Sequence, residues 1–221
     1  VTFAEGCSLT EIPDSAFEYA DFTSIEIPAS VKTIGADAFY GTALEEVTIP
    51  EGVESIGGGA FRSAPSLVKV SLPSTLTYFG DNVFTGCNSL DLAASDIKNS
   101  EALTYRDGVL YSGDMTRLLY YPRTLTNDTY VMPDTVTSFP ESMFRAHEYL
   151  LTITLSPNLT SIPAYSFTNI QKGGELVIPA SVTSIGREAF NNAYFASIVF
   201  EEGCELTSVD TSAFTFVHTD R

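Results

Sequence analysis

The chain has 221 residues, of which 44% are hydrophobic and 18% charged, a composition typical of a globular protein rather than a disordered one. Its formal net charge of −17, from 11 Lys and Arg against 28 Asp and Glu, argues against binding to nucleic acid or to an anionic membrane surface. No stretch approaches the roughly eighteen apolar residues that a membrane span requires. The first residues, VTFAEGCSLT, lack the pattern of a signal peptide. An intracellular protein, or a piece of a longer precursor, is therefore expected.

A phenylalanine, preceded by alanine in five of eight cases, recurs along the whole chain at steps of 22, 22, 23, 60, 23, 23 and 24 residues. The eight positions are Phe17, Phe39, Phe61, Phe84, Phe144, Phe167, Phe190 and Phe214. Such regular spacing predicts repeats that each bury their apolar side chains against the next copy. The long step predicts a β-hairpin-like insert at about 96–129 in a single array over residues 1–221.

Each repeat begins with a short alternating run that ends in proline, such as VTIP at 47–50. Alternation predicts a strand, and proline, which has no N–H group, ends it. Four residues before the phenylalanine the sequence has glycine in some copies (Gly57) and proline in others (Pro163). Because proline cannot adopt a left-handed backbone, this position predicts a turn into a short helical or 3₁₀ segment that ends at the phenylalanine.

The predicted fold is thus a solenoid, a right-handed curved slab with a β-strand ladder and a short helical or 3₁₀ turn in each repeat of 22–24 residues. The side chains expected to face inward are the phenylalanines with Ile25, Ile27, Val47, Ile49, Val53, Ile56, Val70, Leu72, Ile153, Leu155, Leu176, Ile178, Val182, Ile185, Ile198 and Phe200. Two columns are expected to face outward: Ser24, Glu46, Lys69, Thr129, Thr152, Glu175 and Ser197, and Glu26, Thr48, Ser71, Val131, Thr154, Val177 and Val199.

No residue pattern predicts catalysis, a cofactor or a metal. His147 occupies a position that holds alanine or threonine in other repeats, so packing is expected. Cys87 is expected to be a small buried side chain, whereas Cys7 and Cys204 lie in equivalent repeats at opposite ends and cannot bridge within one molecule. The outward columns carry only three acids, which does not favour the paired carboxylates of glycan-cleaving enzymes.

Two sets of residues are candidates for binding a partner. The first lies on the nearly uncharged outward columns and comprises Glu46, Thr48, Lys69, Ser71, Thr152 and Thr154. The second lies in the insert, where tyrosine and arginine, the residues that interfaces favour, are concentrated: Tyr105, Arg106, Tyr111, Arg117, Tyr121 and Arg123. The alternative for the insert is that Leu110, Leu118 and Tyr120 pack onto the solenoid and that the residues between them form ordinary surface.

The stretch LEEVTIPEGVESIGGGAF (44–61), its other copies, and the insert YRDGVLYSGDMTRLLYYP (105–122) closely resemble the BspA-type leucine-rich repeat. This resemblance implies a bacterial surface or secreted protein that adheres to host protein, matrix or other cells without catalysis. The expected partner is a protein or glycan on a host or neighbouring cell, and the expected state is a monomer without membrane insertion. A glycan-active enzyme on a β-solenoid scaffold and a structural spacer stay open as alternatives.

Overall fold

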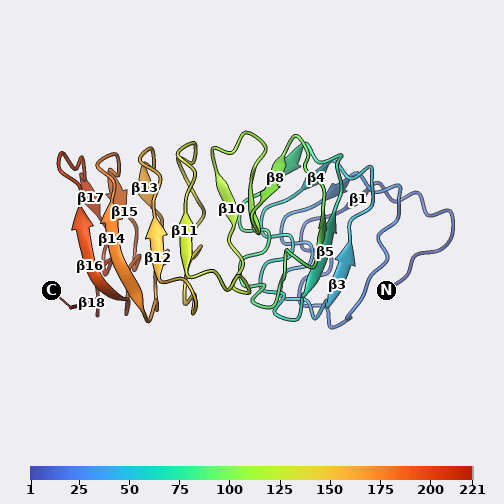
Figure 1. Ribbon diagram of the computed structural model, residues 1–221. Helices are drawn as coiled ribbons and strands as arrows, with labels where there is room; N and C mark the ends of the chain where they lie inside the picture. The colour runs from blue at the N-terminus through green and yellow to red at the C-terminus, as the bar shows by residue number, and fades with distance from the viewer. Residues whose placement is uncertain (221) are drawn as a thin grey trace. The chain divides into compact units, whose positions relative to one another are not determined.

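The computed structural model describes residues 1–220, which form β-strands, turns and bends without a helix. The chain divides into two compact units, Val1–Asp114 and Met115–Arg221, and each consists of coils stacked on one another (Figure 1). Unit 1 and unit 2 denote these two parts below. This architecture confirms the predicted solenoid. Whether the two units continue as one array stays a prediction.

Unit 1 contains two parallel ladders and one hairpin. The first ladder is β1 (Glu11–Ile12), β2 (Thr33–Ile34), β4 (Ser55–Ile56) and β6 (Tyr78–Phe79). The second is β3 (Glu46–Thr48), β5 (Lys69–Leu72) and β7 (Asp96–Ile97), and the antiparallel hairpin is β8 (Leu103–Arg106) with β9 (Val109–Ser112). Asp107 and Gly108 at the hairpin tip both have positive φ, 51° and 84°, which suits the tight turn that an Asp-Gly pair favours. The hairpin lies inside the segment predicted as an insert.

Unit 2 begins with the short strand β10 (Leu118–Tyr120) and continues with three parallel groups (Figure 1). They are β11 (Thr129–Val131) with β12 (Thr152–Thr154); β13 (Ser161–Ile162), β15 (Ser184–Ile185) and β17 (Ser208–Val209); and β14 (Gly173–Ile178), β16 (Tyr194–Phe200) and β18 (His218–Thr219). The register pairs equivalent repeat positions, for example Ile162 with Ile185 and Leu176 with Ile198. Residues at equivalent positions of successive repeats therefore lie above one another in the stack.

The core of each unit is a column of phenylalanine rings. The six inner rings of the predicted eight are at most 1% exposed: Phe39, Phe61, Phe84, Phe144, Phe167 and Phe190. Neighbouring rings stack almost parallel, with centroids 5.0 Å apart between Phe39 and Phe61 and 5.4 Å apart between Phe144 and Phe167. Phe17 and Phe214, in the first and last described coils, are half-buried.

The other predicted inward side chains are also buried, with two exceptions in the last described coil. Ile198 is half-buried and Phe200 is 38% exposed. Both lie on β16, and β18, the strand among residues 1–220 that pairs with β16 on the side away from β14, covers residues 194 and 195 but not these two. The alternation therefore predicts the direction of a side chain correctly, whereas burial also requires a neighbouring coil.

The predicted helical or 3₁₀ segment around each phenylalanine is wrong. The residues two before and two after the phenylalanine have positive φ in every repeat, as Asp37 (51°) and Gly41 (67°) do around Phe39. Consequently alternate N–H groups point in different directions: Tyr40 donates to the Asp37 carbonyl within the coil at 3.0 Å, whereas Phe39 donates to the Ala60 carbonyl of the next coil at 2.7 Å. A helix would direct every N–H group along its own axis and could not bond to the next coil.

In the repeats that have glycine four residues before the phenylalanine, close packing rather than backbone conformation requires it. Gly57 has no positive φ, as the occurrence of proline at this position predicted. A Cβ atom on Gly57 would lie 2.5 Å from the backbone nitrogen of Ala36 in the preceding coil. At Gly57 the adjacent coils therefore approach too closely to accommodate a side chain.

Candidate functional site

The predicted binding residues of unit 1 lie side by side on the exposed surface of β3 and β5. Glu46 faces Lys69 and Thr48 faces Ser71 across the parallel ladder. The first three are exposed, whereas Ser71 is half-buried and directs its hydroxyl group toward the Asp96 carboxylate at 3.4 Å. The structure thus brings these four residues together in a small polar patch of mixed charge.

In unit 2 the predicted residues Thr152 and Thr154 are exposed on β12, and an apolar column crosses the same surface. Val131 on β11 faces Thr154, and Val177 on β14 faces Val199 on β16. The valine side chains are 63%, 37% and 42% exposed, respectively. We call Val131, Thr154, Val177 and Val199 the valine strip.

The column beside the valine strip is polar and carries little charge. It consists of Thr129, Thr152, Glu175 and Ser197, and its one carboxylate accepts a hydrogen bond from Ser197 at 3.0 Å. The sequence placed all of these side chains outward, but the valines were not among the predicted binding residues. Their apolar character in an otherwise strongly acidic chain is the signal that identifies this surface.

In unit 1, two of the three predicted insert residues reach the surface. Tyr105 is partly exposed, and burial is the main cause that raises the pKa of its hydroxyl group. Arg106 is exposed, and its Nε lies 3.3 Å from the Asp107 carboxylate. Tyr111 is only 3% exposed because β9 is covered on both of its faces, with Val109, Leu110 and Tyr111 all buried. Its predicted contact with a partner is therefore wrong.

In unit 2, Tyr121 is 1% exposed, so the prediction that it contacts a partner is also wrong. Tyr121 lies 23 residues before Phe144 and packs against that ring at 5.3 Å, so it fills the phenylalanine position of an additional repeat. Arg117 and Arg123 are partly exposed, and Arg123 donates to the Ala146 carbonyl at 2.6 Å, which is a structural role. The 23-residue spacing from Tyr121 to Phe144 would have revealed the additional repeat if tyrosine had been accepted in place of phenylalanine.

Sequence reasoning missed an aromatic cluster in unit 1. Tyr19 is 68% exposed, and its ring packs edge-on against Tyr40 with centroids 5.0 Å apart. The Arg62 guanidinium carbon lies 4.8 Å from the centre of the Tyr40 ring, and Arg62 Nη2 lies 3.5 Å from Asp37 Oδ1. We call Tyr19, Tyr40, Arg62 and Asp37 the tyrosine ladder. Tyr40 and Arg62 directly follow the phenylalanine marker, and a comparison of this position between repeats would have found them.

The buried titratable groups have structural roles. His147 is 2% exposed, accepts the Leu150 N–H at Nδ1 (3.2 Å) and therefore donates from Nε2 to the Pro122 carbonyl (3.1 Å). Burial lowers the pKa of His147 and raises the pKa of the Cys87 thiol to about 12. Both residues pack in the core, as their positions in the repeat predicted. A neutral imidazole with both nitrogens engaged, and a thiol held in its protonated form, are poorly suited to catalysis.

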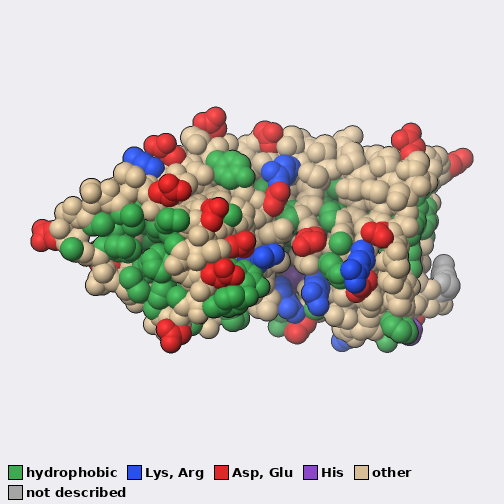
Figure 2. Space-filling view, turned by 180° about the vertical axis from the view of Figure 1, so that it is seen from behind, with side chains coloured by type: hydrophobic (Ala, Val, Ile, Leu, Met, Phe, Trp, Pro, Cys, Tyr) green, Lys and Arg blue, Asp and Glu red, His purple; other side chains and the backbone are tan. Residues whose placement is uncertain are grey.

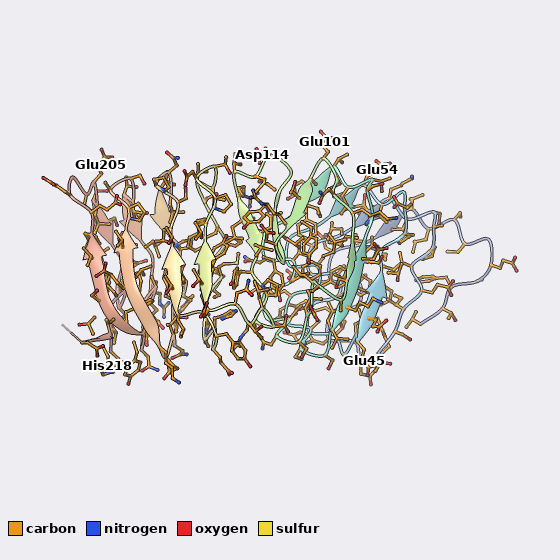
Figure 3. All side chains as sticks on the ribbon, viewed as in Figure 1. Glu45, Glu54, Glu101, Asp114, Glu205 and His218 are labelled. Carbon is orange, nitrogen blue, oxygen red and sulfur yellow. The ribbon has the colours of Figure 1, made fainter. Side chains whose placement is uncertain are left out.

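Several acidic side chains lie in the connections between strands, as Figure 3 shows for Glu54 and Glu101 in unit 1 and Glu205 in unit 2. All three are exposed. Within residues 1–220, no group of three or more His, Cys, Asp or Glu side chains is arranged so that it could hold a metal ion. The same residues contain no helix of the length and apolar character needed to cross a membrane.

Three solved structures share this fold. A leucine-rich repeat protein from Eubacterium ventriosum aligns with a TM-score of 0.72 at 21% identity over 96% of this chain. A leucine rich cell surface protein from Faecalibacterium prausnitzii aligns with a TM-score of 0.62 at 22% identity over 95%, and the pneumococcal vaccine antigen PcpA with 0.59 at 19% over 93%. The chain spans 66%, 58% and 67% of the lengths of these proteins, respectively.

A search of the curated proteins finds no match. The profile of the BspA type leucine rich repeat region, in contrast, matches residues 10–112 and 118–219 with six copies. These two ranges contain the strand ladders and the phenylalanine columns of both units. The chain therefore belongs to the BspA-type leucine-rich-repeat family.

Proposed function

We propose that this chain is a non-catalytic interaction module on a bacterial surface that attaches to a protein of a host or neighbouring cell. Membership of the family supports an interaction module of repeats, and one protein of the same fold is described as a cell surface protein. The observation that carries the proposal is the valine strip. It places three exposed β-branched apolar side chains next to threonine and serine on a chain with a net charge of −17.

The chemistry of the valine strip favours a protein partner. Its side chains stand on paired parallel strands, so the backbone beneath them is fixed and little conformational entropy is lost on binding. When a partner's apolar side chains cover the exposed valines, the removal of apolar surface from water stabilises the complex by about 25 cal/mol per Å². The threonine and serine hydroxyl groups can satisfy polar groups at the rim of such a contact.

The test compares the adhesion of beads coated with the parent chain or a variant to cultured epithelial cells and to a film of extracellular matrix proteins. A double substitution, Val131→Asp with Val177→Asp, places two charges in the valine strip and is expected to lower adhesion at least about tenfold. The control is Val209→Asp, because Val209 is 49% exposed but lies on β17 in another ladder. Equal adhesion of the parent and the double variant, at unchanged melting temperature, would overturn the proposal.

A further inference from the structure

The tyrosine ladder is the strongest unassigned feature of unit 1. Its members come from three successive coils, so they follow one another along the stack at the spacing of the phenylalanines, 5.3 Å and then 5.0 Å between ring centroids. Seen from behind, hydrophobic side chains gather on the surface of the coils near the N-terminus, with acidic and basic side chains beside them (Figure 2). The ladder thus spans about 10 Å, or two inter-strand spacings.

Tyr19 is held as a rigid platform. The Cδ1–Cε1 edge of its ring borders Gly41, where a Cβ atom would be 2.7 Å from the Tyr19 Cδ1 atom. Gly41 has a φ of 67°, which glycine adopts without strain. One edge of the Tyr19 ring is therefore packed against the Gly41 backbone, while the residue remains 68% exposed. An aromatic ring fixed in this way loses little conformational entropy when a flat ligand packs against its open face.

Two polar side chains beside the platform are partly exposed. Arg62 and Asp37 are 39% and 38% exposed, and their contact of 3.5 Å is an ion pair without hydrogen-bond geometry. Arg62 Nε and Asp37 Oδ1 have no hydrogen-bond partner in the described chain, but both atoms are buried, so a ligand can reach only the other polar atoms of these two side chains. The pKa of Tyr19 is raised, chiefly by its hydrogen bond with Tyr40 and then by desolvation; the Glu18 charge also raises it, whereas the Arg62 charge acts in the opposite direction. A donor side chain and an acceptor side chain therefore lie next to Tyr40, which contacts the platform.

We propose that the tyrosine ladder binds a neutral hexose unit of a carbohydrate. The C–H face of a pyranose ring packs on the open face of Tyr19, and adjacent sugar hydroxyls hydrogen-bond to the exposed guanidinium N–H groups of Arg62 and to the carboxylate of Asp37. The sugar is neutral because Arg62 is the only cation in the ladder and Asp37 offsets it. The length of the ladder leaves room for a second unit along the stack. This surface is separate from the valine strip and does not depend on it.

Unit 2 offers a comparison without such a platform. Arg145 lies 6.0 Å from the centre of the Tyr165 ring, but Tyr165 is only partly exposed. Asn192 in the same turn region donates to Asn169 Oδ1 at 2.8 Å, so these amides bond to each other. An arginine–tyrosine contact alone therefore does not support the inference. The inference depends on the exposed Tyr19 ring that packs against Gly41.

The experiment is affinity electrophoresis of the intact chain in native gels that contain one neutral polysaccharide each, a β-glucan, a galactan or a mannan. The parent is expected to be retarded by at least one of them. Tyr19→Ala is expected to lose at least about tenfold in affinity, as one lost aromatic contact implies, whereas Tyr19→Phe keeps the ring and most of the affinity. Tyr149→Ala is the control, because Tyr149 is 48% exposed in unit 2.

Three results would overturn the inference: no retardation of the parent by any of the three polysaccharides, equal retardation of Tyr19→Ala and the parent, or binding to a peptide array through Tyr19 without binding to sugar. Adhesion through the valine strip is measured with different variants. Failure of the carbohydrate site therefore leaves the proposed adhesion untouched, and failure of adhesion leaves the carbohydrate site untouched.

Discussion

Phe61→Ala tests the physical basis of the whole fold. Phe61 is fully buried and lies between Phe39, at 5.0 Å and 5° between ring planes, and Phe84, at 5.8 Å and 23°. Truncating a buried phenylalanine to alanine costs about 3–5 kcal/mol through lost burial and the cavity that remains. Two stacked neighbours, at about 0.5–1.5 kcal/mol each, place Phe61 in the upper part of that range. We expect the free energy of unfolding to fall by about 4–5 kcal/mol.

The cavity cannot close by collapse of the stack, because hydrogen bonds between coils fix their spacing. The Phe39 N–H donates to the carbonyl of Ala60, the residue before Phe61, at 2.7 Å. Urea unfolding followed by far-ultraviolet circular dichroism measures the effect, with Phe216→Ala as the matched control. Phe216 is 72% exposed, so its loss should change stability by no more than about 0.5 kcal/mol. Equal and small effects of the two substitutions would refute the stacked core.

Two further predictions concern stability. Gly57→Ala should destabilise unit 1 because its Cβ would collide with the Ala36 backbone. Gly58→Ala is the control and should lower the melting temperature less, because its Cβ would meet its nearest atom at 3.3 Å. Equal melting temperatures of the two variants would contradict the close approach of the coils. Burial lowers the pKa of His147 in the folded chain. Below about pH 6.5, His147 therefore takes up a proton in the unfolded chain but not in the folded chain, and the stability of the fold should decrease as the pH falls through that value. Melts between about pH 5.5 and 7.5 should show this fall in the parent and in His218→Gln but not in His147→Gln, and a parent that gains stability on acidification would contradict the assignment.

The sequence was sufficient to predict the solenoid because the same physical requirement recurs in every coil. Each repeat needs a ring at the column, and the register pairs one copy with the next, so the spacing of phenylalanines carries the information directly. The direction of strand side chains followed from alternation alone. Pro163 and Gly57 at equivalent positions also excluded a left-handed backbone there, and the structure agrees.

The sequence was not sufficient where a position accepts more than one residue type. Tyr121 fills the phenylalanine position but was read as a surface residue, because its spacing to Phe144 was hidden within the long step. The helical segment was wrongly predicted because residues as different as Asp37 and Tyr165 adopt positive φ at equivalent places. No single-residue propensity indicates such a backbone. The hydrogen bonds to the next coil impose it.

The contact of each coil with the next also explains why the binding residues were harder to predict than the core. A repeat position that contacts the next coil is restricted to side chains that fit the stack, whereas an exposed position is free to differ from coil to coil. Tyr19 therefore has glycine or serine at the equivalent place in the next two coils, and each surface depends only on three or four neighbouring coils. Because coils in a solenoid contact only their neighbours, a substitution in one surface should leave the other intact. Tyr19→Ala combined with the aspartate substitutions in the valine strip should then lower sugar retardation and cell adhesion by the same factors as the separate variants do.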